Sequence, residues 1–228
     1  MTLRASILGK NGRRLLSGLM MVSALYILWT GVPRFLAEVM IVPGRPILEK
    51  VRANTQVSAK DLSTLEQSFL SAISFADLPQ FHAELGTSYL VQAQHTNDRQ
   101  KRLEFAKMAI EESQISLDKA PLNPFAWERI SVAQIILGHY DDAIRAWRSS
   151  SRIASFEPFL LMQRIHIGII LYQHLSSNDI RLLKQQIKMA FHWQRWIMRH
   201  YVRTYHLTSW VTYLSGPDSD ISAFLKKH

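Results

Sequence analysis

The sequence predicts an all-α protein with an N-terminal transmembrane helix followed by a stack of helical hairpins. Three observations lead to this prediction. Residues 15–32 form an 18-residue run without any charge. From about residue 58 onward, apolar and small residues recur at steps of three and four, which is the period of an amphipathic helix. Glycine, proline and capping residues separate these periodic stretches, as is typical of short turns between helices.

Composition limits the classes of protein to which the chain can belong. Its 228 residues, 47% of them apolar, suffice for one compact domain and a short extra segment. The absence of cysteine excludes disulfides, thiolate metal sites and thiol nucleophiles. The net charge is +9, but four of the basic residues lie near the N-terminus, namely Arg4, Lys10, Arg13 and Arg14. The rest of the chain contains 23 basic and 18 acidic residues. We therefore expect no nucleic-acid partner.

The uncharged run at 15–32 approaches the roughly 20 residues that a helix needs to span a bilayer. The basic residues before it favour a cytoplasmic N-terminus. We therefore expect a cytoplasmic basic segment at 1–14, a signal-anchor at 15–32, and a C-terminal domain in the periplasm of a bacterial inner-membrane protein. A cleavable signal peptide with a site at Val22-Ser23-Ala24 is an alternative, as are a buried soluble helix and an organellar presequence.

A linker is predicted at residues 33–57. Pro33, Pro43, Gly44 and Pro46 are expected to interrupt any long helix there. Residues 58–228 are then expected to form the helical domain. Its predicted helices are, in order, 58–76, 79–95, 99–119, 124–137, 141–157, a core helix after Pro158, a long helix from Asn178-Asp179 to about Tyr205, and a terminal cap at 221–227.

The stretch from Pro121 to Pro158 contains the clearest hairpin. Gly138 can adopt the left-handed conformation that ends the first helix, and Asp141 can begin the second. The recurring positions are Trp127, Ile130, Ala133, Leu137, Tyr140, Ala143, Trp147 and Ile153. This order resembles the tetratricopeptide repeat (TPR), here in a membrane-anchored bacterial form. The chain departs from the repeat pattern at Ser131, Gln134 and Ser150, and Pro158 comes about three residues late.

The TPR resemblance implies a solenoid in which the first helix of each hairpin lines a partner-binding groove. The corresponding positions are Ala83, Thr87, Leu90, Val91, Glu128, Val132, Ile135 and Ile136. They are mostly apolar and lack the Lys and Asn array with which TPR clamps hold carboxylate tails. We therefore expect the groove to accept an amphipathic partner helix or the chain's own C-terminal segment. The alternative is that these residues only pack against another helix.

Chemistry-bearing motifs are missing from the sequence. His166 and His174 are eight residues apart and could share one helical face, as could His192 and His200. Eight residues span about 12 Å along a helix, so the two histidines of a pair would be too far apart to bind one metal ion. No nucleotide-binding or nucleophile-elbow motif occurs. We therefore expect no enzyme activity, no catalytic residue, no cofactor and no metal.

A basic, aromatic helix is predicted at 181–205, with Arg195, Arg199 and Arg203 among its cations. Such a helix can contact lipid headgroups or an acidic partner, and its aromatics also fit the spacing of helix packing. The sequence therefore predicts a non-catalytic, membrane-anchored scaffold for protein partners in the cell envelope. A loose resemblance to repeat proteins of exopolysaccharide biosynthesis and secretion suggests an accessory role there. The alternatives are a lipid- or glycan-binding module built on 181–205 and a chaperone of cytochrome assembly.

Overall fold

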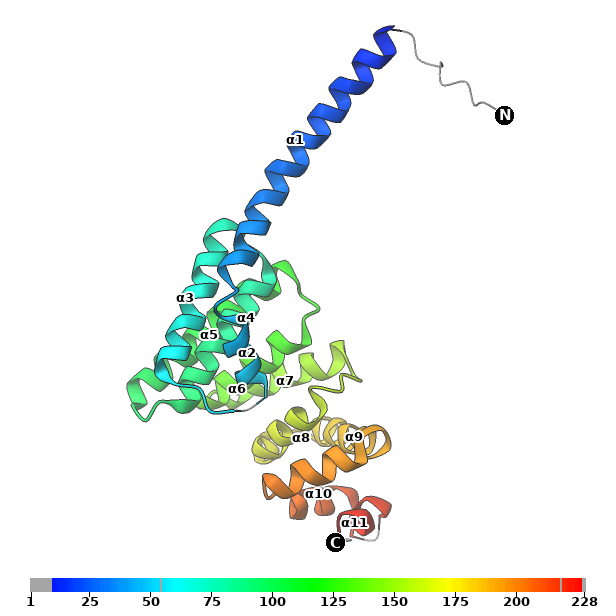
Figure 1. The fold of residues 1–228 in the computed structure, drawn as a ribbon. Helices are drawn as coiled ribbons and strands as arrows, with labels where there is room; N and C mark the ends of the chain where they lie inside the picture. Colours follow the sequence, from blue (N-terminus) through cyan, green and yellow to red (C-terminus); the bar gives the residue numbers. More distant parts are fainter. Residues whose placement is uncertain (1–9, 54, 218, 227–228) are drawn as a thin grey trace, which may run out of the picture. The chain divides into compact units, whose positions relative to one another are not determined.

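The computed structural model describes residues 10–53, 55–217 and 219–226, and every regular element in these ranges is a helix (Figure 1). The all-α prediction is therefore confirmed. Most of the predicted basic segment 1–14, including Arg4, lies outside the described residues. The chain divides into two compact units, one ending at Asp77 and the other beginning at Leu78.

The first unit contains α1 (Lys10–Met40), α2 (Arg45–Arg52) and α3 (Ala59–Phe75). Within the described residues, the part of α1 from Arg14 to Met40 is the one helix long and apolar enough to cross a membrane, or to serve as a signal sequence. Its apolar side chains face outward, and Trp29 is 83% exposed. This helix continues well beyond the expected end at residue 32.

The prediction that Pro33 interrupts the helix was wrong, because Pro33 lies inside α1. A proline in a helix removes one backbone N–H and crowds the preceding turn, at a cost of about 3 kcal/mol. Packing offsets this cost, since α1 lies against α3 and both Ala37 and Ile41 beyond the proline are buried.

The segment predicted as a linker, 33–57, is also largely helical. Pro46 occupies the first turn of α2, where a missing N–H does no harm, and Ile47 and Leu48 of α2 are buried. Pro43 and Gly44 lie in the turn between α1 and α2, so helix interruption is confirmed there, while the linker at 33–57 stays a prediction. The predicted start of α3 is confirmed, because Ser58 and Asp61 form a reciprocal capping box.

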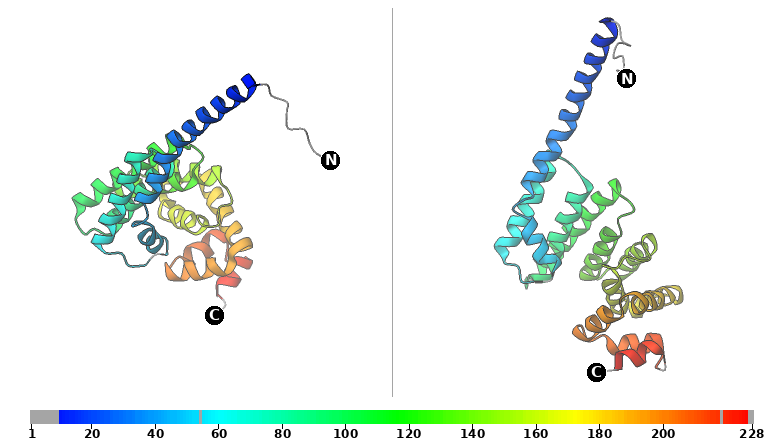
Figure 2. Two further views of the ribbon diagram at one scale, coloured as in Figure 1. Left: turned by 45° about the horizontal axis from the view of Figure 1, so that its top comes forward. Right: turned by 45° about the vertical axis from the view of Figure 1, so that its right-hand side comes forward.

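The second unit begins with two antiparallel helical hairpins (Figures 1 and 2). Helices α4 (Pro79–His95) and α5 (Arg99–Lys119) form the first, and α6 (Pro124–Leu137) and α7 (Tyr140–Ile153) form the second. Gly138 ends α6 in the left-handed conformation with φ of 80°, as predicted. Helix α7 begins one residue before Asp141, with Asp141 and Asp142 in its first turn. These hairpins confirm the TPR-like fold.

Small residues and hydroxyls hold the hairpins together. A Cβ atom at Gly86 of α4 would lie 3.0 Å from Oγ of Ser113 in α5, so only glycine permits this approach without a shift. In the second hairpin, Ser131 Oγ donates to the carbonyl of Ala143 at 2.8 Å. Residues that depart from the repeat pattern thus form hydrogen bonds between helices.

The remaining elements are α8 (Leu161–Ile170), the 3-10 turn η1 (Tyr172–His174), α9 (Ser177–Thr204), α10 (Thr208–Ser215) and α11 (Asp220–Lys226). The cap of α9 is Ser176 rather than Asn178, because Ser176 and Asp179 form a second capping box. Gln194 has non-helical angles, φ −138° and ψ 37°, so α9 is kinked there. The predicted terminal cap is confirmed as α11, whose Ile221 and Leu225 are buried.

The core of the second unit centres on Trp147 of α7 and Arg164 of α8, both fully buried. Trp147 Nε1 donates to the carbonyl of Arg164 at 2.9 Å. The Arg164 guanidinium donates to the carbonyls of Ser150 and Ala154, each at 2.7 Å, and so caps the C-terminal end of α7. Burial lowers the pKa of Arg164 to about 10, which leaves it charged at neutral pH. This side chain fastens α8 to the second hairpin.

Candidate functional site

The predicted groove positions on α4 differ in exposure. Ala83 and Leu90 are buried, whereas Thr87 and Val91 keep part of their surface accessible. Helix α4 contacts α6 directly, so the first helices of the two hairpins lie side by side, as in a helical-hairpin solenoid. Thr87 and Val91 are therefore the α4 positions that remain available to a partner.

On α6 all four predicted positions, Glu128, Val132, Ile135 and Ile136, are half-buried. Val132 and Ile135 pack against the apolar cluster that α7, α8 and α9 share. These two side chains are therefore part of the packing of the second unit, while the occupant of the groove stays a prediction. Glu128 and Ile136 do not belong to that cluster.

Glu128 is the one carboxylate among the predicted groove residues. Burial raises its pKa from the ordinary 4.5 to about 7, although Arg129 and Arg164 act in the opposite direction. Arg129 donates to Ser113, and Arg164 donates to Ser150 and Ala154. Glu128 is thus an acid whose charged form is disfavoured by burial and favoured by two arginines.

This raised pKa predicts a pH-dependent penalty on folding. The penalty is absent below about pH 4.5, where folded and unfolded chains both carry a protonated Glu128, and it is complete above about pH 7. Substitution Glu128→Gln is therefore expected to raise the free energy of unfolding by about 1–3 kcal/mol at about pH 8, and by little at about pH 4.5. Urea denaturation of the full chain in mild detergent at both pH values measures this. Equal stability of variant and parent at the higher pH would contradict it.

Three aromatic side chains lie together where α8 meets the C-terminal end of α9. Nδ1 of His166 lies 3.2 Å from the hydroxyl oxygen of Tyr201. The ring of Tyr205 lies 5.3 Å from that of His166 and 4.4 Å from that of Tyr201. Burial is the main cause that raises the pKa of Tyr201, followed by the charges of Tyr205 and Glu128. Sequence reasoning missed the cluster because His166 and Tyr201 are 35 residues apart in the chain.

The predicted basic residues on α9 mostly hold the chain's own C-terminus. The Arg199 guanidinium lies 4.5 Å from the ring of Trp196 and 4.9 Å from that of Phe224 in α11. Arg203 donates to the carbonyl of Leu225 at 3.1 Å. Arg195 lies more loosely over Phe191, at 6.0 Å. Two of the three predicted contact residues are therefore engaged with α11.

Exposed aromatics near the middle of α9 form a second surface feature. Phe159 is 81% exposed and Trp193 is 64% exposed, and Phe156 packs on Trp193 with 5.3 Å between ring centres. Trp193 belongs to the helix predicted at 181–205, whereas the loop that carries Phe156 and Phe159 has no periodic pattern. Large aromatics left in water at this level are typical of a contact surface.

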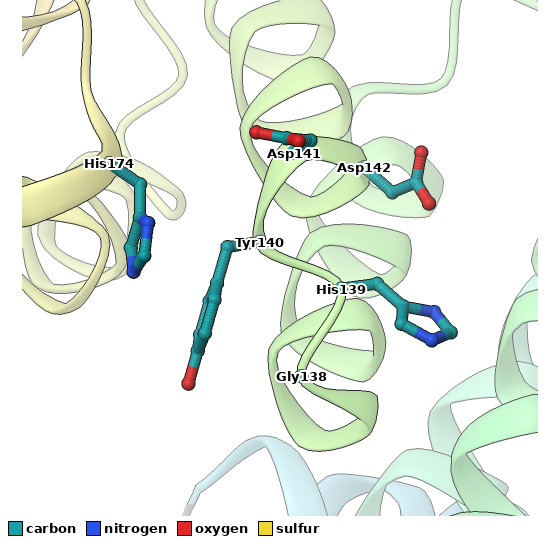
Figure 3. Close-up of a pocket in the computed structure, with 6 residues that line it drawn as sticks. All are labelled: Gly138, His139, Tyr140, Asp141, Asp142 and His174. Carbon is teal, nitrogen blue, oxygen red and sulfur yellow. The ribbon is translucent and has the colours of Figure 1, made fainter.

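A hollow of about 410 Å³ lies at the turn between α6 and α7. Figure 3 shows the rings of Tyr140 and His174 face to face, while His139 and Asp142 point to the other side of the chain. The two stacked rings have centres 4.4 Å apart. Asp142 pairs with Arg145. The lining residues therefore do not converge on one point, and in the part of the chain that the structure describes no three His, Asp or Glu side chains form a metal-binding group.

No protein-family model matches the sequence, and no curated protein matches it significantly. Among solved structures, the chain is similar to a thermophilic TPR protein from Thermus thermophilus. The two share 13% sequence identity with a TM-score of 0.46, and the match covers 76% of this chain and 96% of that chain. The hairpin architecture is established by the helices of this chain, α4–α5 and α6–α7.

Proposed function

We propose that the protein is a non-catalytic scaffold that binds a protein partner across the adjoining faces of α4 and α6. The observation that carries this proposal is the pairing of the two first helices, which leaves Thr87, Val91, Glu128 and Ile136 partly accessible on neighbouring elements. Stacked hairpins of this kind present continuous surfaces to other chains. A partner helix with an apolar face fits Val91 and Ile136.

The scaffold is proposed to be tethered to a membrane by α1. Its exposed apolar side chains over Arg14–Met40 favour lipid over water as their environment, and basic residues precede them in the sequence. We place the N-terminus in the cytoplasm and the second unit in the periplasm of a bacterial inner membrane. An accessory role in exopolysaccharide biosynthesis or secretion belongs to the same proposal.

Photocrosslinking in intact cells tests the scaffold function. A photoreactive amino acid at Val91 or Ile136 is expected to capture one discrete partner, since both positions are half-buried on the proposed face. These positions are better than Ile135, which packs in the core. Gln114, exposed on the second helix of the first hairpin, is the matched control and should capture nothing comparable. Identical products from all three positions would refute a specific face.

The exposed aromatics favour a second candidate, contact with a lipid surface through Phe159 and Trp193. In proteoliposomes containing brominated phosphatidylglycerol, Trp193 would then be quenched, and Trp193→Phe would lower the quenched fraction of the fluorescence. Charge reversal at Arg199 or Arg203 is a poorer test, because both residues hold α11. An unchanged quenched fraction would remove this candidate.

A further inference from the structure

The hairpins of the second unit have two edges that differ in chemistry. In antiparallel hairpins that stack in sequence, the connections between hairpins lie at one edge and the turns within hairpins lie at the other. The connections α5–α6 and α7–α8 are of the first kind. Ser150 Oγ near the end of α7 donates to the carbonyl of Pro124 at the start of α6, at 2.8 Å. The two connections therefore lie close together.

Large apolar side chains protrude from these two connections. Leu122 of the α5–α6 connection is 75% exposed, and Phe159 of the α7–α8 connection is exposed to a similar extent. Phe156 packs on Trp193 of α9 with 5.3 Å between ring centres, so the kinked helix continues the same surface. We call this surface the apolar edge, and its members are Leu122, Phe125, Phe156, Phe159 and Trp193.

The turns at the opposite edge have a different composition. The α4–α5 turn consists of Thr96, Asn97 and Asp98, and the α6–α7 turn consists of Gly138 and His139. Exposed leucine and phenylalanine are therefore not a general property of the turns in this unit. Large apolar side chains that are concentrated at one edge are typical of a contact surface for lipid or for another protein.

Basic residues adjoin the apolar edge and favour an anionic lipid surface. Residues 180–217 contain no Asp or Glu, and their basic residues are Arg181, Lys184, Lys188, Arg195, Arg199 and Arg203. Arg195 follows the kink in α9 directly, and Arg152 lies in the last turn of α7. Both side chains are exposed. Each Lys or Arg near an anionic membrane surface strengthens binding about fivefold.

We propose that the apolar edge inserts into the headgroup region of a membrane rich in anionic lipid, as a second membrane contact separate from α1. The proposal rests on the second candidate function, lipid contact, and specifies the surface and the lipid class. Aromatic side chains settle at the headgroup level, and flanking arginines pair with lipid phosphates. Two acids lie at the same edge, namely Asp118 of α5 and Glu157, which accepts from the backbone N–H of Phe159 at 3.4 Å. The basic residues of 180–217 outnumber them.

The absence of cysteine allows this contact to be measured with single labels on the full chain. Leu122→Cys or Asn97→Cys is labelled with an NBD fluorophore and reconstituted into vesicles of phosphatidylcholine and phosphatidylglycerol that contain a doxyl-labelled lipid. The label at Leu122 is expected to be quenched, whereas the label at Asn97, exposed in the α4–α5 turn, is not. Both proteins contain the same α1, so the anchor cannot account for a difference. Equal quenching at the two positions would overturn the proposal.

Substitutions at exposed positions measure the apolar and the basic contributions separately. With the label at Leu122, the ratio of quenched to unquenched label is expected to fall at least about tenfold in Phe159→Ser, and only slightly in Phe159→Leu. Arg195→Gln is expected to lower the ratio about fivefold, and phosphatidylcholine alone should lower it further. Arg145→Gln, at an exposed arginine nearer the start of α7, should leave it unchanged. Quenching that is insensitive to both Phe159→Ser and Arg195→Gln would refute the apolar edge.

The readouts separate this contact from the other proposals. If Trp193 is quenched but the label at Leu122 is not, lipid contact stands at α9 alone and the apolar edge fails. A label at Leu122 that shifts to the blue without quenching would indicate contact with a second copy of the chain, and would also overturn the proposal. If Ile136 captures a partner in cells while the label stays unquenched, the scaffold stands and the apolar edge fails. The reverse result refutes the scaffold and leaves the apolar edge intact.

Discussion

Replacing Trp147 by alanine is expected to lower the free energy of unfolding by about 3–5 kcal/mol, since a fully buried tryptophan leaves a large cavity in a packed core. Trp147 also joins two elements, because its indole N–H donates to the carbonyl of Arg164 in α8. At Gly168 of the same helix, an added Cβ would approach the Trp147 ring to 3.2 Å and Leu183 to 2.7 Å. The Trp147 ring is therefore tightly packed against α8 and Leu183.

The measurement is equilibrium urea denaturation of the full chain in mild detergent, followed by circular dichroism. Trp147→Phe is the matched control. It keeps most of the apolar volume and removes the hydrogen bond, and we expect it to lose about 1–2 kcal/mol. A Trp147→Ala variant within about 1 kcal/mol of the parent would show that α7 and α8 do not share this core.

Replacing Arg164 by methionine is expected to lower the free energy of unfolding by about 2–4 kcal/mol. Methionine preserves volume, so the loss comes from unpaired polar groups. Without the guanidinium, the carbonyls of Ser150 and Ala154 at the end of α7 lose the hydrogen bonds that Arg164 donates to them at 2.7 Å. Polar groups that lose a partner away from water destabilise the fold. The positive charge near this helix terminus is lost as well.

Two variants make this prediction specific. Arg164→Lys keeps the charge but lacks the forked donors that reach two carbonyls, so it is expected to recover only part of the loss. Arg145→Met removes an exposed arginine that pairs with Asp142 on the surface of α7, and it should change stability by less than about 0.5 kcal/mol. A full recovery by lysine would show that charge alone matters at this position.

The turn and capping residues predicted the hairpins well, because these residues act on the backbone within a few positions in the sequence. Gly138 has the left-handed conformation expected of it, and Ser58 caps α3 as its spacing with Asp61 indicated. The apolar composition after Pro158 also identified α8 as a core helix. Such features depend on neighbours within a few residues, where the chemistry of a single side chain decides the outcome.

Features that depend on packing between helices could not be predicted from the local sequence. Pro33 remains helical because burial beyond it offsets its local cost. Arg164 lies in the stretch that was expected to form a core helix, but its role at the end of α7 depends on a fold that brings both helices together. Ser150, which looked like a departure from the repeat, donates to the carbonyl of Pro124 at 2.8 Å.

The candidate site illustrates the same limit. The sequence selected Glu128 by its position on α6, but it did not predict that His166, Tyr201 and Tyr205 would lie together. It likewise selected Val132 and Ile135 as groove residues, and both pack against an apolar cluster whose members come from several helices. Contacts between helices far apart in the chain decide which groove positions stay open.

The kink at Gln194 divides α9 into two helical segments, because the backbone leaves the helical conformation there. Helices α10 and α11 pack on α9, and Phe224 of α11 contacts the rings of Phe191 and Trp196. This contact covers only part of α9, since Trp196 and Ile197 remain more than half exposed. A large apolar surface therefore stays accessible beside the terminal helices.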